Sequence, residues 1–286
     1  MLKLLQEAEF EHYMDFAYEL ALDPARSGYP VYFDGMKTRE DFVSRTRKAL
    51  ERPGEDILLF VEDGEVEGVI AFEHQEGERY LHPNIFSIRR DTGAALAEFL
   101  DYCRERWPGF TLDLGFPAEN VEALGWLDGQ GIPCNERSWN FLLNLDGYAP
   151  LPEPSGVRRI TAENFEDFAA VHRKVEEGGM YWNCERVRAT LNDWAIFVTG
   201  EGKAAGEVLM TLDDEPHQEI FALEFADGRY HEGAFRALLA VALNLLKSHG
   251  TKWITSFVDE GCPEGDVLKS LGFRLVGTFI CHRLTV

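Results

Sequence analysis

A single carboxylate interrupts an apolar stretch in the second half of the chain, where Glu224 stands in the sequence FALEFA. A glutamate among apolar strand residues holds its proton more tightly, because burial disfavours the charged form. A carboxylate with a raised pKa suits general-base catalysis near neutral pH. Tyr230 and His231 follow as other groups able to carry a proton. The alternative interpretation, a solvent-facing Glu224 on an alternating strand, stays open.

A second pattern stands at the start of a predicted helix in each half. Small residues there let a phosphate approach the backbone N–H groups, where the helix dipole favours negative charge. In the second half Gly233 has this place, and Phe235 either crowds a phosphate or turns into the core as the head of an apolar stripe. In the first half an ordinary helix start remains the alternative. The first-half pattern comprises Arg90, Asp91, Thr92, Gly93, Ala94 and Ala95.

Two loops are rich in aromatic residues. The sequences SGYPVYFDG and EGGMYWN each follow a predicted helix, at matching places in the two halves. Their aromatic side chains either stack on a substrate or cover the end of a core. The candidate substrate-contacting residues are Tyr29, Tyr32, Phe33, Tyr181 and Trp182.

The positioning elements occur twice along the chain. Three pairs of glycines in similar contexts are separated by 138, 140 and 141 residues: Gly68 and Gly206, Gly93 and Gly233, Gly131 and Gly272. A period this long indicates a duplicated domain, because the repeats of solenoid proteins span about 20 to 50 residues. We therefore predict domains at 1–147 and 157–286, joined by a linker at 148–156 that contains three prolines.

Each half follows the order strand, two helices, three strands, helix, strand, helix, strand, which predicts a mixed α/β sheet with helices on both faces. Thr38 and Asp41 have the spacing of a helix-capping pair. The dipeptide Asp63-Gly64 predicts a hairpin between two apolar strands. The helix that begins near Gly233 has an apolar stripe of Phe235, Leu238, Leu239, Ala242, Leu245 and Leu246.

Composition narrows the possible partners. The formal net charge of −22 predicts a surface that repels nucleic acids and anionic membranes. No apolar run has the length of a membrane span, and the first residues lack the basic region of a signal peptide. The five cysteines form no CxxC pattern and the eight histidines lie apart, so we expect neither a metal site nor disulfides, and a cytoplasmic location.

These patterns together resemble the GCN5-related N-acetyltransferase superfamily, in two tandem copies that cover nearly the whole chain. The superfamily's acyl-CoA loop reads Gln/Arg-x-x-Gly-x-Gly/Ala, which the segment from Arg90 to Ala95 matches. Its closing motif has Asn, Ala, Tyr and Gly at fixed spacing. The first half supplies Asn120, Ala123 and Gly131, with Leu127 in place of the tyrosine. The second half agrees only at Gly272 and has Leu268 at the tyrosine position.

The resemblance implies acetyl-CoA as acyl donor and an amine of a small molecule or peptide as acceptor. It implies that Arg90–Ala95 with Asn120, and Gly233 in the second copy, bind CoA, and that the aromatic loops border the acceptor. It implies Glu224 as the base, with Tyr230 as a further catalytic candidate if Glu224 is not. The leucines leave open whether another residue or water protonates the thiolate, or whether neither copy is catalytic. We predict an N-acetyltransferase; the alternative is a non-catalytic tandem fold that binds CoA or serves as a scaffold. The active copy, the acceptor and the oligomeric state stay open.

Overall fold

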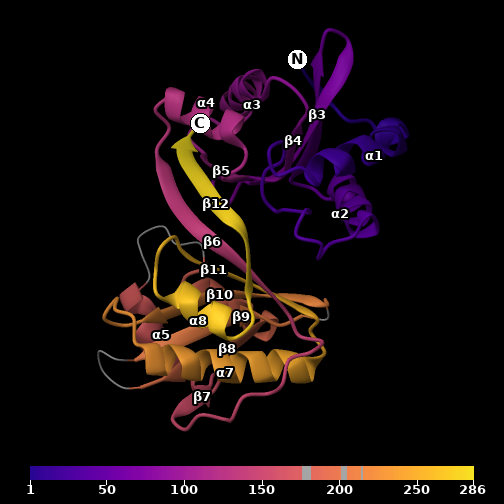
Figure 1. Ribbon diagram of the computed structural model, residues 1–286. Coiled ribbons are helices and arrows are strands. Elements are labelled where there is room, and N and C mark those ends of the chain that lie inside the picture. The colour runs from indigo at the N-terminus through magenta and orange to yellow at the C-terminus, as the bar shows by residue number, and fades with distance from the viewer. Residues whose placement is uncertain (176–181, 201–204, 214) are drawn as a thin grey trace. The chain divides into compact units, whose positions relative to one another are not determined.

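The computed structural model describes residues 1–175, 182–200, 205–213 and 215–286 (Figure 1). The chain forms two compact units. Unit 1 comprises Met1–Ser138 and Gly277–Val286, and unit 2 comprises Trp139–Val276. These units differ from the predicted domains at residues 139–147 and 277–286, because the amphipathic pattern of a strand does not report which sheet it joins.

Two long strands carry the chain between the units. β6 (Cys134–Asn144) begins in unit 1 and ends in unit 2, and β12 (Arg274–Thr285) runs from unit 2 into unit 1. In unit 1, β12 pairs antiparallel with β5 (Thr111–Pro117), from Phe279 opposite Pro117 to Thr285 opposite Thr111. The Arg283 guanidinium also donates two hydrogen bonds of 2.6 Å to the Asp113 carboxylate. Residues 277–286 therefore belong to the sheet of unit 1.

Unit 1 has the strand order β1-β2-β3-β4-β5-β12-β6. Thr38 caps α2 as predicted, since its side chain accepts a hydrogen bond from the N–H of Asp41. Asp63 and Gly64 both have positive φ angles, of 49° and 86°, as a two-residue hairpin requires. Its elements are β1 (Leu2–Leu4), a 3-10 turn (Glu7–Glu9), α1 (Phe10–Ala21), α2 (Arg39–Glu51), β2 (Glu55–Glu62), β3 (Glu65–Gln75), β4 (Tyr80–Ile88), α3 (Thr92–Arg106), β5 and α4 (Val121–Gly129).

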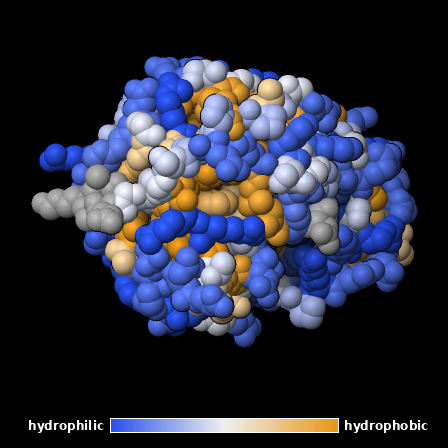
Figure 2. Space-filling model, turned by 90° about the horizontal axis from the view of Figure 1, so that it is seen from below, coloured by the Kyte–Doolittle hydropathy of each residue, from blue (hydrophilic) through white to orange (hydrophobic). Residues whose placement is uncertain are grey.

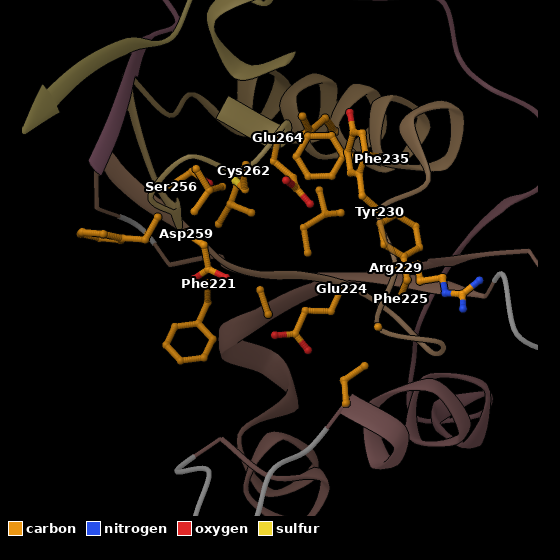
Figure 3. A pocket seen from close by; sticks show the side chains of 18 of the residues that line it. Phe221, Glu224, Phe225, Arg229, Tyr230, Phe235, Ser256, Asp259, Cys262 and Glu264 are labelled. Carbon is orange, nitrogen blue, oxygen red and sulfur yellow. The ribbon is translucent and has the colours of Figure 1, made fainter. Parts of the chain in front are cut away.

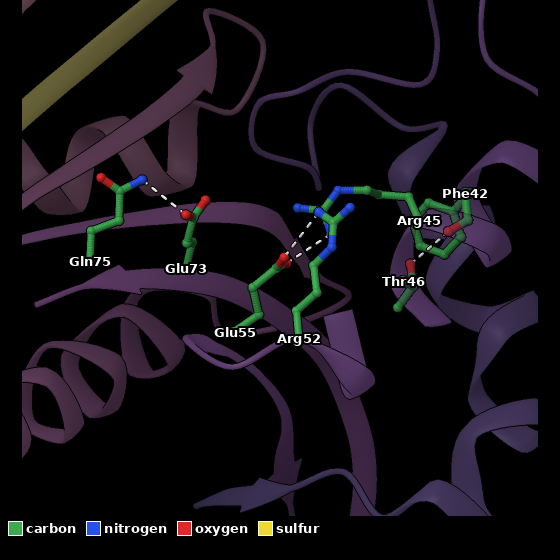
Figure 4. A network of polar contacts seen from close by, with 7 residues as sticks. All are labelled: Phe42, Arg45, Thr46, Arg52, Glu55, Glu73 and Gln75. Atoms are coloured by element: carbon green, nitrogen blue, oxygen red, sulfur yellow. Dashed lines mark hydrogen bonds and ion pairs between the residues drawn. The ribbon is translucent and has the colours of Figure 1, made fainter. Parts of the chain in front are cut away.

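The sheet of unit 1 has a core on each face. Under α1 and α2 the buried residues include Phe10, Met14, Phe42, Leu59 and Val69. Under α3 and α4 they include Phe60, Ile70, Phe86, Phe99 and Phe116. Where α2 meets the edge of the sheet, Arg45 Nη1 donates to the buried carboxylate of Glu55 at 2.8 Å (Figure 4). The ion pair supplies the countercharge that a buried carboxylate needs.

Unit 2 has the strand order β6-β11-β10-β9-β8-β7. Its main core lies between this sheet and α7, whose predicted stripe is buried apart from the partly buried Leu245. Phe141, Leu143 and Leu145, in and just after β6, complete that core. The elements are β7 (Val157–Arg159), α5 (Phe165–Val175), α6 (Cys184–Ala189), a 3-10 turn (Leu191–Asp193), β8 (Trp194–Thr199), β9 (Gly206–Thr211), β10 (His217–Phe225), α7 (Glu232–His249), β11 (Trp253–Asp259) and α8 (Glu264–Ser270).

The surface of unit 2 is not uniformly polar. From the side on which β7 and α7 lie, an apolar patch stands among hydrophilic residues (Figure 2). At these elements a hollow of about 490 Å³ is lined in part by Pro154, Val157, Phe197, Val241 and Leu245. No helix within the described parts of the chain combines the length and the apolar character that crossing a membrane requires.

Candidate functional site

The site in unit 2 begins where two parallel strands part. β10 and β11 pair from His217 opposite Trp253 to Ile220 opposite Ser256, and no further register follows among the described residues. At the same point β10 has a bulge against β9, between Ile220 and Ala222. A bulge bends its strand and increases the local twist. The sheet therefore opens beyond Ile220, and a cavity lies there.

This cavity has a volume of about 600 Å³. Its walls come from β10, β11 and the first turns of α7 and α8. Figure 3 shows Arg229 at one end and Phe221 with Asp259 at the other. Three carboxylates and two cationic side chains line it: Glu224, Asp259, Glu264, Lys174 and Arg229. The volume suits a small-molecule ligand, and the excess of carboxylates favours a cationic group in it.

The N-terminus of α7 forms one rim of the cavity. The N-cap, His231, makes no side-chain capping bond, so the first-turn N–H groups keep their capacity to bind an anion. A Cβ built on Gly233 would meet no atom within 4 Å, which leaves open space above the backbone. Phe235 is 2 % exposed and packs in the core, so it turns inward and does not crowd the space above the helix N-terminus. Arg229, beside this turn, adds positive charge.

Glu224 belongs to a cluster of acid–base groups on the face of the sheet that α5 covers. It lies directly across from Glu207 in the register of β10 and β9, so the two side chains are neighbours on one face. Glu207 is fully buried, and its Oε1 lies 2.5 Å from Nδ1 of His172, which is also fully buried. The other ring nitrogen of His172, Nε2, lies 2.8 Å from the carbonyl oxygen of Trp182.

Geometry fixes the proton count of this His172–Glu207 pair. The Trp182 carbonyl only accepts, so Nε2 of His172 carries a hydrogen. The short contact at Nδ1 then requires one more proton, held by the ring or by the carboxyl group. Burial raises the pKa of Glu207 to about 7; the hydrogen bond and charge of His172 act against this rise and the charge of Glu224 adds to it. Burial lowers the pKa of His172, but the hydrogen bond to Glu207 and its charge outweigh burial and raise it.

Tyr230 stands at the same cavity. Its ring packs edge-on against Phe235, with centroids 5.5 Å apart, and its hydroxyl is buried with no hydrogen-bond partner among the described residues. Burial raises the pKa of the phenol, and the charges of Glu232 and Glu264 act in the same direction. A protonated phenol is thus available as a proton donor. Leu268, at the position of the superfamily's tyrosine, is fully buried in the core of α7 and α8.

In unit 1 the corresponding gap between strands holds the chain's own backbone. β4 and β5 pair at only two positions, Tyr80 with Thr111 and Leu81 with Leu112. Beyond them the segment Arg26–Tyr29 lies between the strands. The N–H of Gly28 donates to the Phe86 carbonyl of β4 at 2.7 Å, and the N–H of Tyr29 donates to the Gly115 carbonyl of β5 at 3.0 Å. Asn120, a predicted CoA-binding residue, donates to the Ser27 carbonyl at 3.1 Å and caps α4.

The predicted phosphate loop of unit 1 is also engaged by protein groups. The Asp91 side chain accepts from the N–H of Ala94 at 3.0 Å, and the Glu122 carboxylate accepts from the N–H of Thr92 at 2.8 Å. A Cβ on Gly93 would lie 2.7 Å from the Trp126 indole. Ala95 is buried in the core and Arg90 is exposed. Two carboxylates thus take N–H groups that a diphosphate would need, which matches the capped-helix alternative.

The aromatic residues of the two loops lie in different surroundings. Tyr29 and Tyr32 are buried against Phe279 and Phe42, so both cover a core. Phe33 is half-buried. Trp182 packs against Trp194 and near Phe221, a lining residue of the cavity, with centroids 4.8 and 6.4 Å apart. Tyr181 lies outside the described residues.

Sequence reasoning missed His172 and Glu207. Glu207 stands in the apolar strand GEVLMT, which is the same signal that singled out Glu224. His172 lies on an amphipathic helix whose sequence pattern is that of an ordinary surface helix. Its contact with Glu207 depends on the tertiary fold. Unit 1 has no acid at the corresponding positions. Glu207 follows Gly206 and pairs with Glu224, whereas Val69 follows the equivalent Gly68 and pairs with Ser87. Within the described residues no group of three His, Cys, Asp or Glu side chains has the arrangement of a metal site.

Comparison with known proteins places this arrangement in a known fold. No protein-family model matches the sequence, and no curated protein matches it either. The structure is similar over its whole length to a GCN5-related N-acetyltransferase from Sphaerobacter thermophilus, with a TM-score of 0.67, 18 % identity and 95 % of that chain covered.

Two further solved structures extend the comparison. A tandem GNAT protein from the clavulanic acid biosynthesis pathway matches with a TM-score of 0.58 and 16 % identity, and the match covers 100 % of this chain and 98 % of that one. A GCN5-related glucosamine N-acetyltransferase region of a fungal multi-domain β-N-acetylglucosaminidase matches with a TM-score of 0.62 and 11 % identity, and the match covers 99 % of this chain and 38 % of that one. The chain therefore has the tandem fold of the GCN5-related N-acetyltransferases, as the sequence resemblance predicted.

Proposed function

We propose that this chain is an acetyl-CoA-dependent N-acetyltransferase whose reaction takes place in unit 2, on an amine of a small molecule or peptide. The observation that carries the proposal is the cavity between β10 and β11, which has the uncapped N-terminus of α7 and Glu224 on its walls. The engaged loop and filled gap of unit 1 support unit 2 as the binding unit.

Different residues of the cavity would bind the donor and transfer protons. The N–H groups around Gly233 and the Arg229 guanidinium would hold the diphosphate of acetyl-CoA. When bound, acetyl-CoA would supply an activated acyl group, whose transfer forms a C–N bond and breaks a C–S bond. Glu224 would take a proton from the ammonium of the acceptor, which leaves the nitrogen a lone pair for attack. Tyr230 would donate its hydroxyl proton to the sulfur and regain a proton from the acylated nitrogen.

The charged residues that line the cavity indicate which charge the acceptor carries. Glu224, Asp259 and Glu264 surround the cavity with carboxylates. These attract a protonated amine and disfavour an anionic acceptor. Phe221, 38 % exposed at the bulge, offers an aromatic surface beside them. We therefore expect cationic amines to be better acceptors than amines that carry a carboxylate.

Isothermal titration of the full chain with acetyl-CoA tests where the donor binds. We expect one site per chain, and we expect Gly233→Val to weaken binding at least tenfold, about 1.4 kcal/mol, because its side chain fills the open space above the α7 N-terminus. Gly125→Val is the matched control, since Gly125 also lies in a helix with nothing near its Cβ position.

Three results would contradict the proposal in different ways. Two equal sites would place a donor in unit 1 as well. Equal affinity of Gly233→Val and the wild type would move the diphosphate away from α7. Binding of acetyl-CoA without release of CoA on addition of any amine of a broad panel would favour the non-catalytic alternative.

A further inference from the structure

Glu207 has a buried oxygen that no group of the described structure satisfies. Its Oε1 faces His172, but its Oε2 is buried and has no hydrogen-bond partner among the described residues. A buried polar atom without a partner loses its hydrogen bonds to water and gains none in return, and the loss is greater for a charged group. Most buried polar side-chain atoms of native proteins have a hydrogen-bond partner, so this oxygen calls for one. The residue directly across from Glu207 on β10 is Glu224, which also carries a carboxyl group.

We propose that Glu207 and Glu224 form a carboxyl dyad, in which Glu207 Oε2 accepts a hydrogen bond from Glu224 once Glu224 has taken the proton of the acceptor amine. This inference rests on the proposed function and adds a positioning residue to it. Glu207 does not touch the substrate; it acts through Glu224.

The proton balance of the dyad follows from its neighbours. Before the reaction His172 and Glu207 share one proton between Nδ1 and Oε1, and Glu224 is ionised. The acceptor R–NH3⁺ becomes R–NH2, and Glu224 becomes a carboxylic acid whose O–H donates to Glu207 Oε2. Glu224 then returns the proton to solvent through the cavity, which it lines. No oxidant or further reactant is needed.

Among the described residues, two cationic groups lie near the dyad. His172 faces it from α5, and Lys174 of the same helix lines the cavity. In β8 the residue opposite Glu207 is the apolar Val198. Two carboxylates side by side cannot both ionise as readily as a single one, and the second therefore holds its proton more tightly. The dyad makes Glu224 a stronger base than a lone glutamate in the same cavity.

The test follows the titration of Glu224 in the full chain. Carbon-13 labelling of the glutamate side chains gives a carboxyl signal for Glu224, assigned by its loss in Glu224→Gln. We expect this signal to titrate above the ordinary glutamate range in the wild type. In Glu207→Gln, which keeps the size of the side chain and removes its charge, we expect the midpoint to fall by at least one pH unit. Glu219→Gln, also on β10 and outside the cavity lining, should leave it unchanged.

A kinetic measurement gives the dyad a second readout. With acetyl-CoA and phenethylamine as the probe amine, we expect the acidic limb of kcat/KM to move down by at least one pH unit in Glu207→Gln, while acetyl-CoA affinity stays within twofold. An unchanged midpoint, or an upward shift, would overturn the dyad. Because the carbon-13 titration needs no turnover, a protein that acetylates nothing refutes the proposed function and leaves the dyad to be judged by its midpoint.

Discussion

Glu224 is half-buried, lines the cavity and faces Glu207, so a single side chain joins the cavity to the buried acid–base cluster. The sequence predicted this residue, because a charge in an apolar strand is rare unless something in the fold uses it.

Replacing Glu224 by Gln removes the proton acceptor and keeps the shape of the side chain. We expect acetyl-CoA affinity to be retained and turnover to fall by about 10² to 10⁴ near neutral pH. The loss should shrink as pH rises, because an amine that is already neutral needs no base. Steady-state release of CoA over a range of pH measures this. Asp259→Asn, which removes another carboxylate of the cavity, is the control and should lower turnover by less than tenfold. A Glu224→Gln variant with wild-type turnover at every pH would leave the proton to Tyr230 or His231, or to no residue.

The residues that sequence reasoning did not find are those that act through contacts across elements. His172 and Glu207 lie 35 positions apart and meet only because α5 packs on β9. Likewise the segment from Arg90 to Ala95 matches a phosphate loop in its letters, whereas Glu122, 30 positions from Thr92, takes up one of its N–H groups. A motif specifies the residues at a helix start, and tertiary contacts decide what else those residues bind.

At the scale of elements, the segment Arg26–Tyr29 fills the gap between β4 and β5 of unit 1. In unit 1 it bonds to β4 and β5 through Gly28 and Tyr29, and Ser27 forms a bridge with Ser87. A Cβ on Gly28 would lie 3.1 Å from the Gly115 carbonyl and from Phe86, so a larger side chain there requires these neighbours to move. The segment acts as a short extra strand between two strands that have parted.

Gly28→Val tests this packing. A larger side chain in a filled space should reduce the free energy of unfolding by about 1–3 kcal/mol, which urea denaturation measures. Gly77→Val is the control, since a Cβ at Gly77 meets no atom within 4 Å. Equal stability of the two variants would mean that the segment does not occupy the gap in solution. Because acetyl-CoA is expected to bind in unit 2, its affinity should be the same in both.

The local sequence patterns predicted most helices and strands, but the predicted bounds of some of them were wrong. β4 begins at Tyr80, earlier than the predicted strand near Asn84–Ile88, and Pro83 lies within it. A proline argues against a central strand, because it cannot donate to the ladder. Here it stands at the register shift between Ala71 and Phe72, where pairing is already interrupted. The hairpin at Asp63-Gly64 and the cap at Thr38 were predictable, because both depend on residues within four positions.

At the scale of the whole molecule, each unit contains strand residues from both halves of the sequence. Unit 1 takes Gly277–Val286, and unit 2 takes residues from Trp139 onward. The prolines of 148–156 predicted a linker, and the structure includes these residues in unit 2. A break in the sequence pattern does not assign the strands on either side of it to a sheet.

Arg283→Met tests whether residues 277–286 hold unit 1 together. The substitution removes the guanidinium from the buried Asp113 carboxylate, which keeps its hydrogen bond of 2.9 Å from the Tyr80 hydroxyl. We expect a loss of roughly 1.5–3 kcal/mol in unfolding free energy, the usual cost of removing hydrogen bonds to a charged group. Arg104→Met breaks an exposed pair with Asp101 and should cost less than about 1 kcal/mol. Hydrogen exchange at the amides of β5 locates the effect, and equal losses in the two variants would show that β12 contributes little there.

Because β12 is the last strand of the chain, unit 1 can be completed only after unit 2 has been synthesised. During synthesis, domains usually fold as they emerge, and the earlier one folds first. Here Ser138 leaves the ribosome 139 residues before Gly277, the start of the segment that completes its sheet. At about 5–20 residues per second this wait lasts roughly 7 to 28 s. Throughout it β5 presents the unpaired backbone groups that β12 later covers, so unit 1 has to be kept from other chains while unit 2 is still being made.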